Sequence, residues 1–153
     1  ASVMLDKFHD PPASGALDLG DSLVGEVQAI EVVWEPPTAL LRATHANEHQ
    51  ATEDGAYAVA FAVANDCGYR VRRRAHHGSG ADYLLTRAGE PTGGFVKLEV
   101  SGVARPRKLA RLRARMKQKL RQLERGDLQG PGLAVVVGFE SVEVLMRTMG
   151  GRP

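Results

Sequence analysis

The stretch FVKLEVSGVARPRKLARLRARMKQKLRQLERGDLQGPGLAVVVGF, residues 95–139, decides the fold. Its first seven residues alternate between apolar and polar side chains, which predicts a strand. After Pro106, leucine and methionine recur at three- and four-residue spacings, which predicts an amphipathic helix over 107–125. The continuous apolar run over 133–139 predicts a strand that is buried on both faces. Together these elements predict an α/β domain.

The residues before this stretch predict a strand over 24–34 and then a proline-free helix. The helix is expected to begin after Thr38 or Thr44 and to extend to Cys67. Gly68 is placed to end it in the left-handed conformation. Beyond it, short β-forming runs separated by turn residues predict three strands: 69–75, 81–86 and 95–101.

The two ends of the chain carry weaker patterns. Residues 1–22 are rich in Asp, Pro, Gly and Ser without a sustained period, which predicts an irregular or mobile arm. Ser141 and Glu143 predict the start of a short last helix that extends to Met149. We therefore expect an acidic N-terminal arm with one strand over 1–40 and an α/β domain over 41–153.

The composition places the chain among globular proteins. It has 153 residues, of which 43% are hydrophobic and only one is cysteine. This length can bury one core, and a single cysteine excludes an internal disulfide framework and favours a reducing compartment. The longest apolar run, 56–64, is too short to span a bilayer. We therefore expect a cytoplasmic protein without a membrane partner.

The net charge of +2 hides a strong asymmetry. Residues 1–68 carry eleven acidic and two basic side chains, whereas residues 69–153 carry eighteen basic and seven acidic ones. The segment 105–125 alone holds ten basic residues and one acid. This charge must be offset by a polyanion such as nucleic acid, by the acidic half itself, or by a homodimer or partner protein joined through the two halves.

The predicted order of helix, three strands, helix and strand over residues 48–140 is similar to the restriction-endonuclease-like core of the PD-(D/E)XK nuclease superfamily. In that family an Asp opens the second core strand, and an acidic residue, followed two positions later by a lysine, lies on the third. Asp82 and Glu99 stand at the corresponding places. The resemblance implies an endonuclease that depends on Mg²⁺ or Mn²⁺, with Asp82, Glu99 and the carbonyl of Val100 as metal ligands.

The lysine of the family motif is displaced, because Ser101 stands two positions after Glu99. Lys97 lies on the same strand face as Glu99 and is expected to orient the attacking water or to offset charge on the phosphate. Lys108, at the start of the next helix, is a second candidate for this role. The first helix offers a third carboxylate, Glu53 or Glu48.

A duplex is the expected substrate, because no aromatic residues interleave with the basic ones of the cationic helix. Four further arginines in 70–74 add to the cationic surface, although arginines on an edge strand also oppose aggregation. On this interpretation the nucleic acid is duplex DNA. The residues expected to contact it are Arg105, Arg107, Lys108, Arg111, Arg115 and Lys119, together with the loop residues His76 and His77.

Two other functions compete with this one. The first is a catalytically inactive relative that serves as an interaction or immunity-type module, in which Glu99 pairs with a cation such as Lys97 instead of a metal. The second is a zinc peptidase, because His45, Glu48 and His49 form an H-x-x-E-H motif, for which Glu124 is a possible third ligand.

Overall fold

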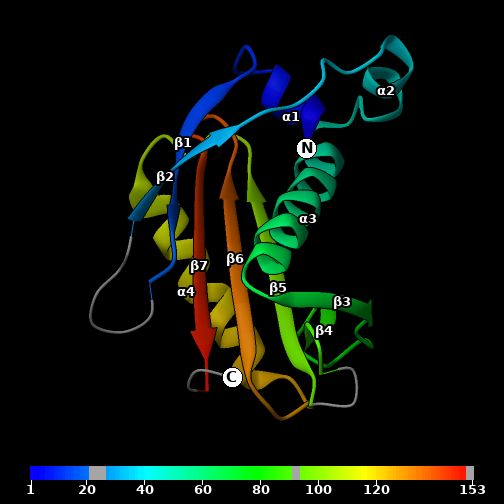
Figure 1. Cartoon of the computed structure of the whole chain (residues 1–153), viewed down its shortest axis with the longest axis vertical. Helices are drawn as coiled ribbons and strands as arrows, with labels where there is room; N and C mark the ends of the chain where they lie inside the picture. The colour runs from blue at the N-terminus through cyan, green and yellow to red at the C-terminus, as the bar shows by residue number, and fades with distance from the viewer. Residues whose placement is uncertain (21–26, 91–93, 151–153) are drawn as a thin grey trace.

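The structure of the chain, a computed structural model, describes residues 1–20, 27–90 and 94–150 (Figure 1). Its centre is a seven-stranded mixed sheet with the strand order β2-β1-β7-β6-β5-β4-β3. The elements in chain order are α1 (Ser2–Asp6), β1 (Ala13–Asp18), β2 (Val27–Val32), α2 (Ala39–Thr44), α3 (Glu48–Asp66), β3 (Tyr69–Arg74), β4 (Tyr83–Arg87), β5 (Val96–Val103), α4 (Leu109–Arg125), β6 (Gly132–Gly138) and β7 (Glu143–Met149).

The predicted α/β class is confirmed, and the sheet is mixed and flanked by helices. β5 and β6 run parallel, as do β1 and β7, whereas all other neighbouring strands are antiparallel. Helix α3 packs on β3, β5 and β6 on one face, and α4 packs on β5, β6 and β7 on the other (Figure 1). None of the helices in the described ranges is both long and apolar enough to cross a membrane.

Strand β5 packs against both helices, as β6 does, and its alternation decides which of its side chains face each helix. Leu98 and Val100 belong to the core under α3, whereas Val103 belongs to the core under α4. Helix α3 crosses β5 closely, because a Cβ atom on Gly102 would lie 2.4 Å from the backbone oxygen of Thr52. The odd-numbered residues of β5 therefore face α4.

The predicted helix that ends near Cys67 is two helices. The Thr38 hydroxyl accepts a hydrogen bond from an α2 backbone amide, so this short helix has its own start, and α2 ends at Thr44. Helix α3 begins after Asn47, whose side chain accepts hydrogen bonds from two backbone amides of the first turn. Gly68 follows it with φ at +84°, as predicted.

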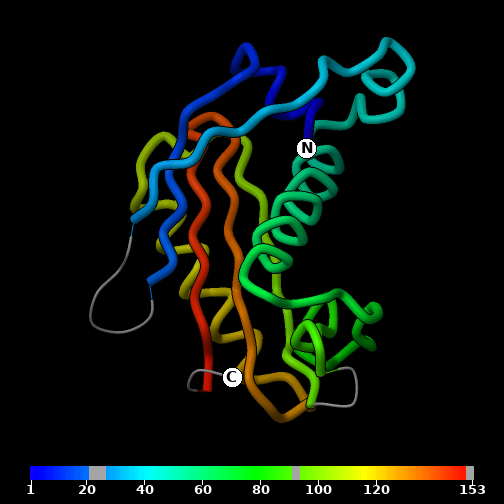
Figure 2. The backbone as a smooth tube through the Cα atoms, viewed as in Figure 1, coloured from blue at the N-terminus to red at the C-terminus, as the bar shows by residue number. Residues whose placement is uncertain are grey.

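The prediction of an irregular arm over residues 1–22 is wrong for the residues that the structure describes. Met4 and Leu5 of α1 are buried in the core, and α1 packs against α3. Strand β1 pairs with β2 and with β7, so the N-terminal strand lies beside the C-terminal one (Figure 2). One sheet thus includes strands from both of the predicted segments, 1–40 and 41–153.

The predicted last helix to Met149 is also wrong, because these residues form β7. After β6 the chain reverses in a tight turn in which Val142 has φ at +48°. It then pairs with β6 in antiparallel register from Gly138↔Glu143 to Gly132↔Met149. The other predicted strands, and the helix over 107–125, lie within about three residues of their observed bounds; the first three residues of the predicted strand 24–34 lie outside the described residues.

Candidate functional site

A notch in the sheet forms where β4 begins beside β5. The regular pairing of the two strands reaches Tyr83↔Leu98, and the amide of Asp82 still donates to the Leu98 carbonyl at 2.8 Å. The Asp82 carboxylate then accepts a hydrogen bond from the amide of Val100, also at 2.8 Å. Among the described strands, none pairs with this edge of β5 beyond that point. The carboxylate of Asp82 therefore stands at the open end of the β4–β5 pairing.

Glu99 lies between the two β5 residues that Asp82 contacts, and its side chain faces α4. Only 5% of Glu99 is exposed, which is unusual for a carboxylate on an otherwise apolar strand. The Nζ atom of Lys119 on α4 lies 2.7 Å from its Oε1 atom. The buried carboxylate therefore has a cationic partner, as burial of a charge requires.

The pKa of Glu99 reflects both of its charged neighbours. Burial is the largest cause of the rise, the hydrogen bond and charge of Lys119 oppose it, and the charge and hydrogen bonding of Asp82 add to it, so that the pKa of Glu99 is raised to about 7. The Asp82 carboxylate is thus close enough to oppose the ionisation of Glu99, and a cation beside the two groups would favour the ionised form of Glu99.

Helix α3 supplies two more polar groups near the notch. The Tyr57 hydroxyl donates to Oε1 of Glu53 at 3.5 Å, and the Tyr57 ring packs edge-on against Tyr83, with centroids 5.3 Å apart. Burial, followed by the negative charges of Asp82 and Glu53, raises the pKa of Tyr57, so its hydroxyl remains a proton donor. Glu53 itself is exposed, and no group of three or more His, Cys, Asp or Glu in the described ranges could hold a metal ion.

A cleft of about 740 Å³ extends from this notch between the first turns of α3 and the exposed side of α4. Its floor is the open edge of β5 and the segment that follows it, 100–105. Two residues connect the cleft lining to the carboxylate site. Lys119 lines the cleft and binds Glu99, and Glu53 lines the cleft and accepts a hydrogen bond from Tyr57. The remaining lining residues of the walls are Glu48, His49, Thr52, Arg107, Arg111 and Arg115.

The cleft has an excess of positive charge. Arg105 pairs with Glu48 at 2.7 Å, but Arg107, Arg111 and Arg115 form no ion pair with any carboxylate in the described parts of the chain. Within those parts, no carboxylate of the acidic half pairs with an α4 side chain. The described part of the acidic half therefore does not offset the cationic helix through ion pairs, which leaves the positive charge of the cleft wall available to another partner.

Lys97 lies on the same face of β5 as Glu99, as predicted, but the structure does not bring its ammonium to Glu99. The Nζ atom donates to the carbonyl oxygens of Leu123 at 2.6 Å and Leu128 at 2.8 Å, so it closes the C-terminal end of α4. Burial lowers the pKa of Lys97. Lys108, the other candidate, is the exposed N-cap residue of α4 and does not line the cleft.

The loop before Asp82 is held against the end of α4 instead of covering the cleft. The Nε2 atom of His76 lies 3.0 Å from Oδ1 of Asp127, and His77 is exposed. The loop backbone is so close to the helix end that a Cβ atom on Gly126 would lie 1.9 Å from the oxygen of Ser79. Neither histidine lines the cleft, so their predicted contacts with nucleic acid stay predictions.

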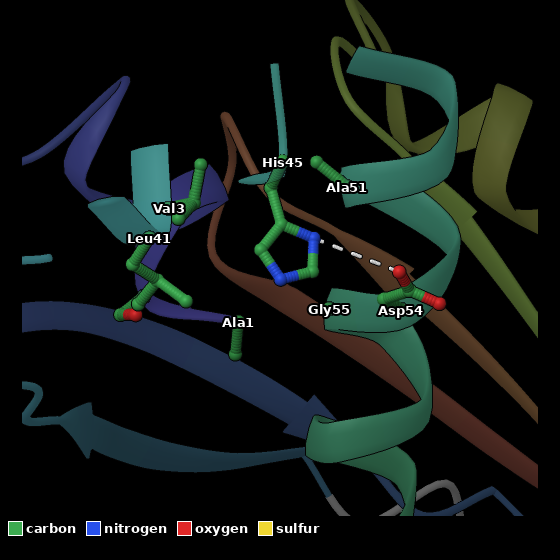
Figure 3. A pocket seen from close by; sticks show the side chains of 8 residues that line it. Ala1, Val3, Leu41, His45, Ala51, Asp54 and Gly55 are labelled. Atoms are coloured by element: carbon green, nitrogen blue, oxygen red, sulfur yellow. Dashed lines mark ion pairs between the residues drawn. The ribbon is translucent and has the colours of Figure 1, made fainter. Parts of the chain in front are cut away.

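The H-x-x-E-H residues are not on one helix. His45 caps the end of α2, and His49 lies in the first turn of α3, so the helical spacing that the peptidase motif requires is missing. His45 points across a pocket of about 170 Å³ toward Asp54, with 3.6 Å between Nδ1 and Oδ2 (Figure 3). Glu48 pairs with Lys7 and with Arg105. Both cations, Lys7 more than Arg105, hold the pKa of the Glu48 carboxyl below its usual range.

Sequence reasoning assigned Lys119 to nucleic-acid contact and missed its pairing with Glu99. A signal for it exists in the sequence, because Lys119 stands three residues after Met116 and one before Leu120, on the flank of the apolar stripe. A long side chain at this position can reach the sheet from the flank of the helix face that packs on it. Tyr57 was also missed, since a tyrosine in an apolar helix is expected to be a core residue.

No model of a known protein family matches this chain. No curated protein matches it either. The search of solved structures also found no match. Function is therefore inferred from the geometry of the chain's own residues.

Proposed function

We propose that the chain is a metal-dependent nuclease that cleaves phosphodiester bonds in duplex nucleic acid, with duplex DNA as the expected substrate. The observation that carries this proposal is the juxtaposition of Asp82 and Glu99 at the open edge of β5. Neither carboxylate lines the cationic cleft itself, but their contacts Val100 and Lys119 do. The order of α3, β3, β4, β5, α4 and β6, with one helix on each face, supports a restriction-endonuclease-like core.

The two carboxylates suit a hard divalent cation. Mg²⁺ is commonly bound through one or two carboxylates and several waters, so a pair of carboxylates and a backbone carbonyl, that of Val100, are sufficient protein ligands. The part of the rise in the pKa of Glu99 that Asp82 causes is relieved when a cation joins the two carboxyls. When bound, Mg²⁺ supplies a water that deprotonates more easily and neutralises charge on the phosphate.

The chain's own residues orient this site. The amide of Val100 fixes the Asp82 carboxylate, and Lys119 favours the ionised form of Glu99 and places a cation beside it. In this proposal Lys119 takes the role that the sequence assigned to Lys97, namely to orient the attacking water or to offset charge on the phosphate. The Tyr57 hydroxyl positions Glu53 on the opposite wall.

The substrate would lie along the cationic wall of α4. Arg107, Arg111 and Arg115 have no carboxylate partner among the described residues. Arg111 donates one hydrogen bond to the Arg105 carbonyl and Arg115 one to the Gln118 side chain, and their other guanidinium N–H groups would bind phosphate oxygens. Such binding does not depend on base identity, and its affinity falls steeply as the salt concentration rises.

Cleavage of plasmid and short duplex DNA tests the proposal. We expect products only with Mg²⁺ or Mn²⁺, and their loss in Asp82→Asn and Glu99→Gln, which keep the shape of each side chain. Glu90→Gln, an exposed acid beyond the far end of β4, is the matched control and should cleave like the unaltered protein. Cleavage that survives in both site variants would overturn the assignment.

A second candidate function is an inactive module of the same fold that binds nucleic acid or a protein. The observation that favours it is the Glu99–Lys119 ion pair, which can neutralise the buried carboxylate without a metal. Calorimetric titration separates the two functions. Heat from Mg²⁺ or Mn²⁺ binding that is lost in Glu99→Gln supports the nuclease, whereas no metal binding together with a salt-sensitive dimer supports the module.

A further inference from the structure

A second cationic surface lies on the other side of the notch from α4, on the edge strand β3 (Figure 1). We name its four arginines the arginine row: Arg70, Arg72, Arg73 and Arg74. β3 pairs only with β4, and a register irregularity between Val71 and Arg73 interrupts the alternation of its side chains. Every residue after Tyr69 is exposed, so the row is presented to solvent.

The charge of the arginine row is not neutralised within the described parts of the chain, because none of its members forms an ion pair with a carboxylate there. Arg70 donates only to the backbone oxygens of Asn65 and Tyr69. Four like charges within five residues repel one another, and an anionic partner would relieve that repulsion.

Two of these guanidinium groups are held in place by aromatic rings. The Cζ atom of Arg73 lies 5.7 Å from the centroid of Phe95, and that of Arg74 lies 5.7 Å from the centroid of Tyr83. A guanidinium over a ring keeps its N–H groups free for other acceptors, and loses less freedom when it binds them. Phe95 is 45% exposed, so this arrangement is on the surface and not part of the core.

The arginine row leads directly to the candidate site. Arg74 pairs with Tyr83 in the β3–β4 register, and the next amide, that of Ala75, donates to the Asp82 carbonyl at 2.9 Å. The carboxylates of Asp82 and Glu99 therefore lie between two cationic surfaces, the row on β3 and the wall of α4. A polymer with regularly repeated negative charge matches this arrangement.

We propose that the arginine row is a second contact surface for the phosphate backbone of a nucleic-acid duplex, which extends across the notch from α4 to β3. A duplex is favoured over a single strand because Phe95 is the only large exposed aromatic residue among those described, and stacking platforms need several. The inference shares its ligand with the proposed function but does not depend on cleavage. Protection of the sheet edge from aggregation is the alternative that the test must exclude.

The test measures affinity of the full chain for fluorescent DNA and RNA duplexes in EDTA over a series of salt concentrations. We expect Arg72→Gln/Arg73→Gln to weaken binding roughly ten- to a hundredfold near physiological salt, and to lower the slope of log K against log[salt] by about 2. Arg72→Lys/Arg73→Lys, which keeps the charge, should restore most of that slope. Arg42→Gln is the control for total charge, because it removes one exposed positive charge, that of an arginine on α2 that pairs with Asp6 at a distance from the site.

The outcomes separate this inference from the proposed function. An unchanged affinity and slope in the Gln variant, with or without self-association in light scattering, overturns the role of the arginine row. The expected loss of affinity in a protein that never cleaves with Mg²⁺ or Mn²⁺ upholds the contact surface and refutes the nuclease. Equal loss of affinity in Arg42→Gln also overturns the inference, because it would show an effect of total charge alone.

Discussion

The Nζ atom of Lys119 lies 2.7 Å from Oε1 of Glu99, so the one buried carboxylate of β5 is held by a cation from α4. This pair sits where the cationic wall of the cleft meets the notch of the sheet. Glu99 also interacts with Asp82, so a single ion pair couples the charge of the helix to that of both candidate metal ligands.

Lys119→Met should destabilise the protein, because it leaves the buried carboxylate of Glu99 without its cation. We expect the free energy of unfolding to fall by about 2–3 kcal/mol at pH 8, and by less at pH 5, where Glu99 is protonated. Urea unfolding monitored by circular dichroism measures it. Lys117→Met, at an exposed position of the same helix, is the control and should change stability by less than about 0.5 kcal/mol.

The raised pKa of Glu99 makes the stability of the metal-free protein depend on pH. The folded chain binds this proton more tightly than the unfolded one, so the stabilisation is fully present below about pH 4.5 and is lost as the pH rises through about 7. The shift corresponds to about 3 kcal/mol. Urea unfolding of the protein and of Glu99→Gln in EDTA between pH 4.5 and 8 measures the difference. Parallel curves for the two proteins would contradict the prediction.

Arg111→Gln/Arg115→Gln should weaken duplex binding through lost phosphate contacts. We expect the slope of log K against log[salt] to fall by about 2, with no preference among duplex sequences. Arg113 on the same helix does not line the cleft, so Arg113→Gln is the matched control and should leave the slope nearly unchanged. Fluorescence anisotropy with two unrelated duplexes checks both points, and equal slopes for all three proteins would refute binding in the cleft.

The central elements of the fold could be predicted because their local patterns and their tertiary environments agree. The apolar run over β6 and the periodic apolar stripe of α4 each indicate one structure only. The ends could not be predicted in this way. Residues 143–149 form a strand because the turn at Val142 returns the chain beside β6, where it pairs in antiparallel register. Residues 13–18 form a strand because they pair with β2 on one side and with β7 on the other. Both depend on distant residues rather than on their own period.

The candidate site could be predicted only in part, for a similar reason. The alternation of β5 correctly placed Lys97 and Glu99 on one face, and the turn before β4 brought Asp82 beside Glu99. Which lysine reaches the carboxylate, however, depends on the position of α4 relative to the strand. That position is set by the packing of the helix on β5, β6 and β7, so no spacing along the chain reveals it.

Lys97→Met should lower stability without removing the chemistry of the site. The variant keeps the apolar stem but leaves the carbonyls of Leu123 and Leu128 without their shared donor, so we expect a loss of about 2–3 kcal/mol in the free energy of unfolding. Cleavage per folded molecule, measured at a temperature where circular dichroism shows the variant fully folded, should stay near that of the unaltered protein. We expect folded Lys119→Met to lose cleavage and folded Lys97→Met to keep it, because of these two lysines only Lys119 contacts Glu99. Loss of cleavage in folded Lys97→Met, with normal cleavage in folded Lys119→Met, would show that Lys97 has the catalytic role.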